Sequence, residues 1–542
     1  MASASDEHQA PIMPTPDLDP PATLRFPPSR LGALAALALG ACGVVDEPPA
    51  IAAQAAPLAG PPASPGAPGI GDTLFPDLGN GGYQVEHYHL DLRYATAAPS
   101  QALDGTVTIL ARATQALSQL DLDFAGDSLA AVTVDGRRAA YRRDGDELVI
   151  TPARALRRGE WFTITVEHFV ATPKVADASV LLGAPFFYTV DGSAWAGQPN
   201  NAHQIFPSND HPSNKASFSF RLDVPAGTTA VASGELIEQH MIGGRTISQY
   251  LQREPMATEL VEVAVGALTV IPRVDHAGVR IRDVVPTRLT AELAPKLALE
   301  LAQLDWLRDR LGAYPFHSYG SLVADASLGF ALETQSLSLY EHGFFLAPET
   351  SYGPIMLHEL AHQWFGDSVA PARWSDVWQN EGHATWYERT WVNDPDSIEL
   401  ISLAQQLYSL GDLFRKFLGP VAAPTSGEPT ALFSPNAYFG GFLVLFALRQ
   451  QIGDPAFRAV ERAWVTRYRG RAASTEDFIA LASEVSGQDV SAFLQDWLFG
   501  TTTLAMPGHP DWTVIPPDSF PLAGLAAPAL LPMLGLPPLV RH

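Results

Sequence analysis

Apolar and polar residues alternate in short runs through the first half of the chain. The runs are Tyr88, Leu90, Leu92 and Tyr94; Leu120, Leu122 and Phe124; and Phe218, Phe220, Leu222 and Val224, closed by Pro225. Successive side chains of a β-strand point to opposite faces, so this period of two predicts strands with one buried face. Asp-Gly pairs at 135–136 and 144–145 are typical of tight hairpin turns. Residues 72–275 are therefore predicted to form an antiparallel β domain.

The hydrophobic period changes near residue 290. Apolar positions now lie mostly three or four residues apart, at Leu293, Leu297, Leu301, Leu304 and Leu311. This spacing places them on one face of an amphipathic helix, predicted over 290–312. Helical patterns continue to about residue 500, with a strand-like stretch at 318–340 between them. The chain is thus predicted to be multidomain, with a mainly helical domain at 276–512 after the β domain.

The N-terminal region has the pattern of an export signal. Arg30 precedes an apolar run of 11 residues, which is too short to cross a bilayer but suits the core of a signal peptide. The run ends in Leu39-Gly40-Ala41-Cys42, which resembles a bacterial lipobox. We therefore predict a leader at 1–42, a lipidated Cys42 that attaches the protein to a membrane, and a place in the bacterial cell envelope. An alanine-rich leader without lipidation is the alternative.

Two segments near the ends of the chain have a biased composition. Residues 43–71 are rich in Pro and Ala and are predicted to be a tether, and 513–542 form an apolar tail whose prolines prevent a regular helix. Cys42 is the single cysteine, so no internal disulfide can form. A net charge of −24 argues against a surface that binds nucleic acid. No protein partner is predicted.

A His-Glu-x-x-His motif carries the main chemical signal. His358 and His362 lie four residues apart, on one face of a helix, and can offer two imidazole nitrogens to one metal ion. Glu359 lies beside them and is predicted to act as the general base. A catalytic zinc takes a third protein ligand, and Glu381, separated from His362 by 18 residues, is the best candidate. For the bare motif, an amphipathic helix with two packed histidines is the alternative.

The longer stretch around this motif resembles a known family. The segments HELAHQWFG and, after the gap, WSDVWQNEG are similar to those of gluzincin aminopeptidases of the aminopeptidase N type. The resemblance implies an all-β, saddle-like N-terminal domain followed by a mainly α, thermolysin-like catalytic domain. It also implies one Zn²⁺ per chain, held by His358, His362 and Glu381, and hydrolysis of the N-terminal peptide bond of peptides. The chain resembles short members, without the large C-terminal helical domain.

The resemblance extends to three further site residues. Tyr438, 57 residues beyond Glu381, stands where the family has the tyrosine that stabilises the oxyanion. Glu333, in the stretch LGFALETQ, stands at the glutamate of the family's Gly-Ala-Met-Glu-Asn motif, which binds the free α-ammonium group. Gln198 stands where long members have a second glutamate, and it carries no charge. Without the resemblance, Tyr438 would be a packing residue and Glu333 a capping or solvated one.

Departures from the family pattern leave other functions open. Phe330, Leu332 and Thr334 replace motif residues beside Glu333. One alternative is a zinc peptidase without a strict requirement for a free amine. Another is a catalytically silent envelope lipoprotein that binds a partner. His383 is predicted to be structural, while Asp376 and Asn380 either orient zinc ligands or cap helices.

Overall fold

A computed structural model describes residues 62–95, 102–172 and 186–519 of the chain. These residues belong to one compact unit, which begins at Pro61. The predicted leader, Cys42 and most of the predicted apolar tail lie outside the described residues.

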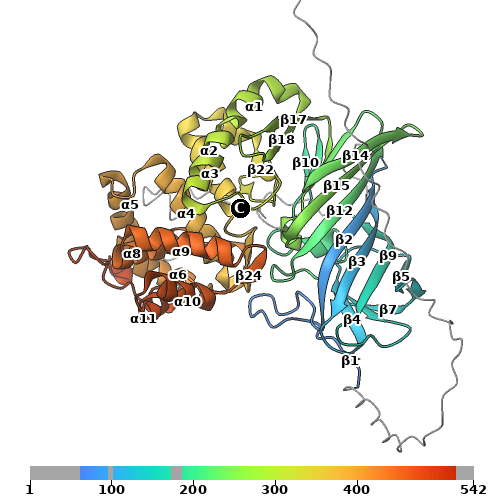
Figure 1. Ribbon diagram of the computed structural model, residues 1–542, viewed down its shortest axis with the longest axis horizontal. Helices are drawn as coiled ribbons and strands as arrows, with labels where there is room; N and C mark the ends of the chain where they lie inside the picture. The colour runs from blue at the N-terminus through green and yellow to red at the C-terminus, as the bar shows by residue number, and fades with distance from the viewer. Residues whose placement is uncertain (1–61, 96–101, 173–185, 520–542) are drawn as a thin grey trace, which may run out of the picture. The chain divides into compact units, whose positions relative to one another are not determined.

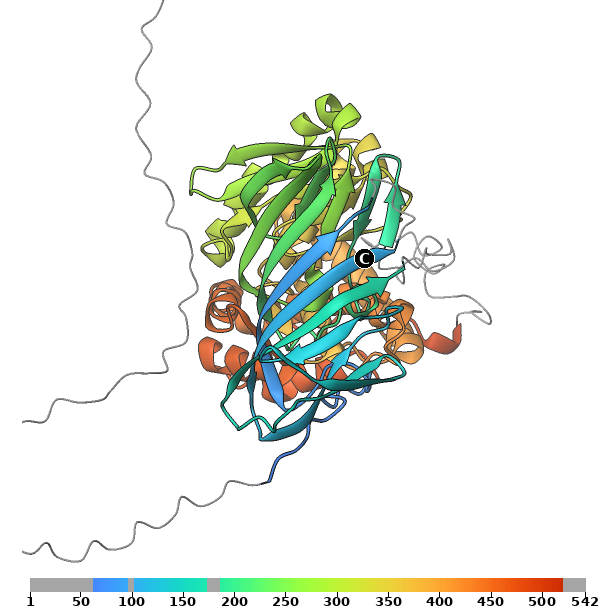
Figure 2. The same cartoon turned by 90° about the vertical axis from the view of Figure 1, so that its right-hand side faces the viewer.

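An eight-stranded sheet forms the centre of the β domain (Figure 2). Its strands, in spatial order, are β14 (Glu235–Ile242), β15 (Arg245–Met256), β12 (Ala216–Pro225), β2 (Tyr83–Arg93), β3 (Leu103–Ala113), β9 (Trp161–Ala171), β5 (Ala131–Val134) and β6 (Arg137–Arg138). Neighbouring strands pair antiparallel except β2 and β12, which are parallel. The prediction of a purely antiparallel domain is wrong at this pair. Parallel strands need a long crossover, and more than a hundred residues separate these two.

The alternation of apolar residues in the sequence corresponds to the buried face of this sheet. Leu90 and Leu92 of β2 are fully buried, as is Phe218 of β12, while the residues between them are partly exposed. The turn between β5 and β6 has Asp135 at φ 51° and Gly136 at φ 69°. Two positive φ angles in a two-residue loop match the right-handed twist of a hairpin.

Two four-stranded sheets flank the large one. The first contains β1 (Ser64–Pro65), β4 (Leu117–Asp123), β8 (Glu147–Thr151) and β7 (Ala140–Asp144); the second contains β10 (Phe186–Thr189), β11 (Gly192–Trp195), β16 (Val263–Gly266) and β13 (Thr229–Ala232). β1 lies within the segment predicted as a tether and pairs with β4. The β domain therefore holds the chain from about residue 64 onward.

A six-stranded sheet and a group of helices make up the second domain (Figure 1). The strands are β17 (Leu268–Val274), β18 (Arg280–Pro286), β19 (Ser318–Tyr319), β20 (Ser321–Ala324), β21 (Ala331–Leu332) and β22 (Ser338–Glu341). The helices are α1 (Thr290–Leu297), α2 (Leu299–Leu311), α3 (Glu349–His362), α4 (Trp378–Val392), α5 (Ile398–Ser409), α6 (Gly411–Leu418), α7 (Pro429–Leu432), α8 (Gly441–Ile452), α9 (Asp454–Arg467), α10 (Thr475–Ser486) and α11 (Ser491–Phe499). The helix predicted over 290–312 is two helices, and Pro295, which cannot donate a backbone hydrogen bond, lies just before the break.

The most apolar helical run of the described residues lies in the core of this domain. Pro429–Ile452 is long and apolar enough to cross a membrane, but 94% of its most apolar window is buried inside the molecule. Because protein atoms surround it, we interpret the run as a core element. Its last helix, α8, packs against α4.

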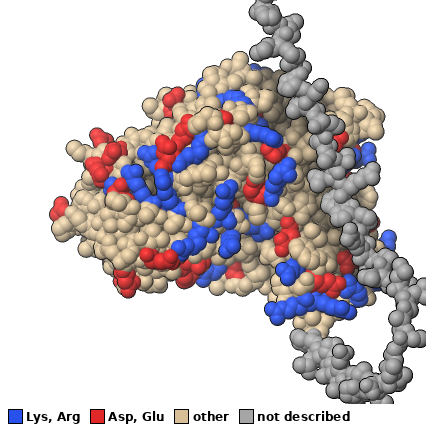
Figure 3. Space-filling view, viewed as in Figure 1, with Lys and Arg blue, Asp and Glu red and all other residues tan. Residues whose placement is uncertain are grey.

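Charged side chains of both signs are interspersed on the face shown in Figure 3. Arg467 pairs with Glu484 at 2.7 Å, and Arg373 pairs with Glu476 at 2.5 Å. Such exposed pairs contribute little to stability, about 0–1 kcal/mol each.

Candidate metal centre and active site

Helices α3 and α4 pack against each other and bring the three predicted zinc ligands together (Figure 1). The Nε2 atoms of His358 and His362 each lie 3.5 Å from Oε2 of Glu381. All three side chains are fully buried. Ligand atoms about 2.05 Å from a tetrahedral zinc would lie about 3.3–3.4 Å apart. The spacing and the nitrogen and carboxylate donors therefore fit Zn²⁺.

The outer nitrogen of each histidine has a hydrogen-bond partner. Nδ1 of His358 lies 3.1 Å from Oε2 of Glu388, and Nδ1 of His362 lies 3.0 Å from the carbonyl oxygen of Phe365. An Nδ1–H that donates to these oxygens leaves the lone pair of Nε2 facing the centre. Hydrogen bonds within the protein thus orient both histidines toward the centre.

The centre attracts positive charge. Burial disfavours the protonated form of His358, but the carboxylates of Glu381 and Glu388 outweigh it and raise the pKa of this imidazole to about 9. A cation is therefore favoured at this position. Glu388 was not among the predicted site residues, although it lies seven residues after Glu381 on the same face of α4, a periodicity that could have revealed it.

The two residues predicted to be catalytic border the same centre. Carboxylate oxygens of Glu359 and Glu333 and a ring nitrogen of His362 all lie within 4.8 Å of one another. Tyr438 lies in the π-helical turn η6 (Asn436–Gly440), and its ring stacks on that of His358, with centroids 6.0 Å apart. Burial and the carboxylates of Glu381 and Glu333 raise the pKa of Tyr438 well above its usual value. The phenol therefore keeps its proton and can donate it in a hydrogen bond.

A contact between two glycines sets the distance between α4 and α8. A Cβ atom on Gly382 would lie 2.8 Å from Cα of Gly441, and a Cβ on Gly441 would lie 2.7 Å from Cα of Gly382. Both distances are shorter than any real contact, so the two backbones touch where no side chain fits. Glu381 immediately precedes one glycine, and Tyr438 lies one turn before the other.

Gly441→Ala is expected to push α8 away from α4. The added methyl group meets backbone atoms that cannot rotate aside, so we expect about 1–3 kcal/mol lower stability. Displacing Tyr438 should also reduce kcat, by up to about 100-fold for a shift of about 1 Å. Thermal unfolding measures the first effect and steady-state kinetics the second. Gly353→Ala is the control and should change neither strongly, because its Cβ would meet only side-chain atoms, of Leu299 at 3.2 Å and of Glu349 at 3.8 Å.

The two residues predicted to bind the substrate amine lie in contact. The side-chain nitrogen of Gln198 donates to Oε1 of Glu333 at 2.7 Å, and both residues are buried. Gln363, directly after His362, donates to the carbonyl oxygen of Glu333 at 3.1 Å and accepts from the backbone nitrogen of Ser336 at 2.8 Å. The predicted amine site is thereby tied to the end of the helix that bears both histidines.

The neighbours of Glu333 that depart from the family motif fill core positions. Leu332 is buried in the apolar core of the β domain, and Phe330 packs against that core. The hydroxyl of Thr334 donates to Oε2 of Glu262 at 3.2 Å. All three residues therefore belong to the packing around Glu333.

His383 lies apart from the zinc ligands, as predicted. Its Nε2 lies 3.2 Å from Oε1 of Glu461 and its Nδ1 lies 2.6 Å from the carbonyl oxygen of Gln379. Its ring stacks on Phe365 with centroids 4.2 Å apart. Nε2 thus joins α4 to α9 through Glu461, while Nδ1 makes a contact within α4.

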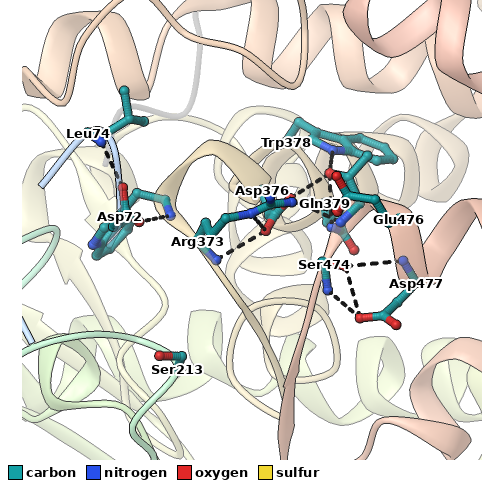
Figure 4. A network of polar contacts seen from close by, with 12 residues as sticks. Asp72, Leu74, Ser213, Arg373, Asp376, Trp378, Gln379, Ser474, Glu476 and Asp477 are labelled. Carbon is teal, nitrogen blue, oxygen red and sulfur yellow. Dashed lines mark hydrogen bonds and ion pairs between the residues drawn. The ribbon is translucent and has the colours of Figure 1, made fainter. Parts of the chain in front are cut away.

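Asp376 holds helix ends in position. Its carboxylate accepts hydrogen bonds from the nitrogen and the hydroxyl of Thr475, at 3.0 and 2.7 Å, and from Arg373 (Figure 4). Of the two roles left open by the sequence, the contacts are those of a cap that joins the start of α4 to α10. Asn380 packs against Gly366, in the turn after α3.

The sequence matches known family models in both domains and is similar to several known proteins. Residues 84–260 match the Peptidase M1 N-terminal domain and residues 297–497 the Peptidase family M1 domain. Aminopeptidase N of Lactococcus lactis subsp. lactis is 28% identical, over 60% of this chain and 41% of its own length. Leukotriene A-4 hydrolase of Xenopus laevis is 25% identical, over 73% and 67%. Aminopeptidase M1-D of Oryza sativa subsp. japonica is 26% identical, and the chain spans 36% of its length.

A solved structure covers both domains. The M1 zinc metallopeptidase from Deinococcus radiodurans is 30% identical, with a TM-score of 0.72 over 81% of this chain and 99% of that one. A β domain followed by a helical domain with a His-His-Glu centre defines a two-domain zinc metallopeptidase. The chain belongs to peptidase family M1. The predicted family and fold class are confirmed.

Proposed function

We propose that this chain is an aminopeptidase that uses one Zn²⁺ to hydrolyse the N-terminal peptide bond of peptides. The observation that carries the proposal is the convergence of the His358, His362 and Glu381 ligand atoms within reach of the Glu333 carboxylate. Among the structural relatives, one from Deinococcus radiodurans is bound to a Tyr-Ser-Ala substrate. A short peptide of this kind is the substrate class we assign here.

The chain's own residues supply the remaining chemistry. When bound, Zn²⁺ would act as a Lewis acid toward water and the peptide carbonyl. Glu359 takes up a proton from the attacking water and delivers it to the leaving amine. The Tyr438 hydroxyl donates a hydrogen bond to the oxygen on which negative charge develops. Glu333 pairs with the substrate α-ammonium group, and this pairing restricts cleavage to the amino end.

Hydrolysis of aminoacyl fluorogenic amides tests the proposal. Each amide is assayed free and N-acetylated, with the purified protein before and after zinc is removed by a chelator. We expect cleavage of the free amides only, lost with the metal and restored by Zn²⁺. Equal cleavage of acetylated amides would instead support a peptidase without an amine requirement. No cleavage by protein that holds one equivalent of zinc would support a catalytically silent binding protein.

Gln198→Ala should weaken binding of the free amine. Loss of the 2.7 Å hydrogen bond leaves the Glu333 carboxylate less well oriented, so KM for free aminoacyl amides should rise about 10-fold, equivalent to about 1.4 kcal/mol. Steady-state kinetics separate this from kcat, which should change less. The control is Gln249→Ala, because Gln249 donates to Glu238 at an exposed position of the β domain. An unchanged KM in Gln198→Ala would remove Gln198 from the amine site.

We further propose that the protein is anchored in the bacterial cell envelope through a lipidated Cys42. The support is the lipobox-like sequence alone, because Cys42 lies outside the described residues. Cys42→Ser should move the protein from the membrane fraction to the soluble fraction. An unchanged distribution would overturn the anchor and leave the enzymatic proposal untouched.

A further inference from the structure

A buried lysine of the β domain contacts the metal-binding domain. Lys215 immediately precedes β12, and only 8% of its surface is exposed. Its ammonium group donates to the backbone carbonyl oxygen of Asp367 and, at 2.9 Å, to that of Ser368. Burying an ammonium group is unfavourable unless it is hydrogen-bonded, so these two carbonyls are held tightly to it.

The two carbonyls belong to the connection between the zinc-ligand helices. The backbone nitrogen of Asp367 donates to the carbonyl oxygen of His362 at 3.0 Å, and that of Ser368 donates to Gln363 at 3.2 Å. The chain reverses here through Gly366, at φ 120°, and continues through β23 (Val369–Pro371) into α4. Lys215 therefore holds the turn that follows the second histidine and leads to Glu381.

The lysine is itself fixed in position. β12 lies inside the eight-stranded sheet, paired with β15 on one side and β2 on the other. The side chain of Asn214 accepts a hydrogen bond from the backbone nitrogen of Val85 in β2 at 3.2 Å. The large sheet thus provides a rigid base from which Lys215 reaches the second domain.

A second contact from the β domain holds the same connection further along. Oδ2 of Asp72 accepts a hydrogen bond from the backbone nitrogen of Trp374 at 2.7 Å and lies 3.1 Å from Nε2 of His211. Asp72 lies beside the start of η5 (Trp374–Asp376), which leads into α4 (Figure 4). Two independent contacts of the β domain therefore act on the segment between His362 and Glu381.

We propose that Lys215 is a positioning residue for the metal centre. By holding the carbonyls of Asp367 and Ser368, it keeps Glu381 at ligand distance from His358 and His362. Through Gln363, which bonds to the backbone of Glu333, it also keeps the amine site at a set distance from the metal. The inference rests on the metal site of the proposed function and adds a role for the β domain in that site.

Lys215→Met tests the inference with readouts of metal geometry. In the Co²⁺-loaded protein, the d–d absorption bands report the arrangement of ligands, and we expect them to shift in the variant. Zn²⁺ should be lost to a chelator about 10-fold faster than from the wild type, in line with the effect of removing outer support from a metal ligand. KM for free aminoacyl amides should also rise about 10-fold, in proportion to the displacement of Glu333.

Lys296→Met is the matched control. Lys296, in α1, also donates to a backbone carbonyl, that of Phe345 at 2.6 Å, but outside the connection between α3 and α4. Its loss should lower stability and leave the Co²⁺ spectrum, the rate of zinc loss and KM as in the wild type. A similar change of these three quantities in both variants would mean that Lys215 acts only through general stability.

A folded Lys215→Met protein with wild-type spectrum, zinc retention and KM would overturn the inference. If that variant does not fold, Lys215→Arg replaces it. The larger planar guanidinium cannot occupy the ammonium position without moving the two carbonyls, so zinc loss should again be faster, and a wild-type rate would contradict the proposal. The outcome is separate from that for the proposed function, which is tested on the wild-type protein alone with free and acetylated amides.

Discussion

Glu359→Gln is expected to lower kcat about 1,000-fold or more and to leave zinc bound. Glu359 is buried in α3 between the two histidine ligands, and its carboxylate lies within 4.8 Å of a nitrogen of His362. Glutamine keeps the shape of the side chain but cannot take up a proton, and general bases contribute about 10²–10⁴-fold to rates. Steady-state hydrolysis of a free aminoacyl amide, with metal content measured on the same sample, gives the result.

Two comparisons make this prediction specific. Glu484→Gln, at an exposed carboxylate that pairs with Arg467, should retain full activity and shows whether a charge change alone matters. Zinc at one equivalent in Glu359→Gln separates the loss of a base from the loss of the metal. A variant that keeps more than about a tenth of the activity would exclude Glu359 as the base, because proton transfer contributes at least about 100-fold.

Tyr438→Phe should lower kcat about 100- to 1,000-fold with little change in KM. Removing one donor to a developing oxyanion costs about 2.7–4 kcal/mol in comparable sites. The Tyr438 ring stacks on His358, and burial with nearby carboxylates keeps its hydroxyl protonated, as a donor must be. We expect kcat rather than KM to change, because the hydroxyl would stabilise negative charge that develops in the transition state and is absent from the bound substrate.

Tyr387→Phe provides the control for a lost buried hydroxyl. Tyr387 lies in α4, and its hydroxyl donates to Oε2 of Glu461 at 3.1 Å rather than to a predicted zinc ligand. Its removal should cost about 1 kcal/mol of stability and change kcat less than about twofold. If Tyr438→Phe shows the same pattern, with lower stability and nearly unchanged kcat, the residue is only a packing residue.

Local periodicity explains which parts of the structure could be predicted. The alternation around Leu90 and around Phe218 predicted strands, because one face of each strand is buried in the same core. His358 and His362 face one point because they lie on one helix, which is a property of spacing alone. The gap between His362 and Glu381 made Glu381 a candidate ligand, and the family resemblance supported that choice. Tyr438 was selected by the resemblance alone.

Contacts between segments distant in the sequence could not be predicted from the hydrophobic pattern. Lys215 binds carbonyls 152 and 153 residues further along the chain, and backbone carbonyls have no sequence signature. The parallel pairing of β2 with β12 depends on which distant strands meet in the sheet. Neither is encoded by a period of two or of 3.6 residues, so both required the three-dimensional structure.

The glycine contact between α4 and α8 limits how substrate preference can be changed. Where Gly382 meets Gly441 there is no side chain whose rotamer could adjust the separation of Glu381 from Tyr438. Directed evolution toward longer or bulkier substrates therefore has no gradual path through this crossing. Variation should accumulate instead around Gln198, whose side chain meets that of Glu333.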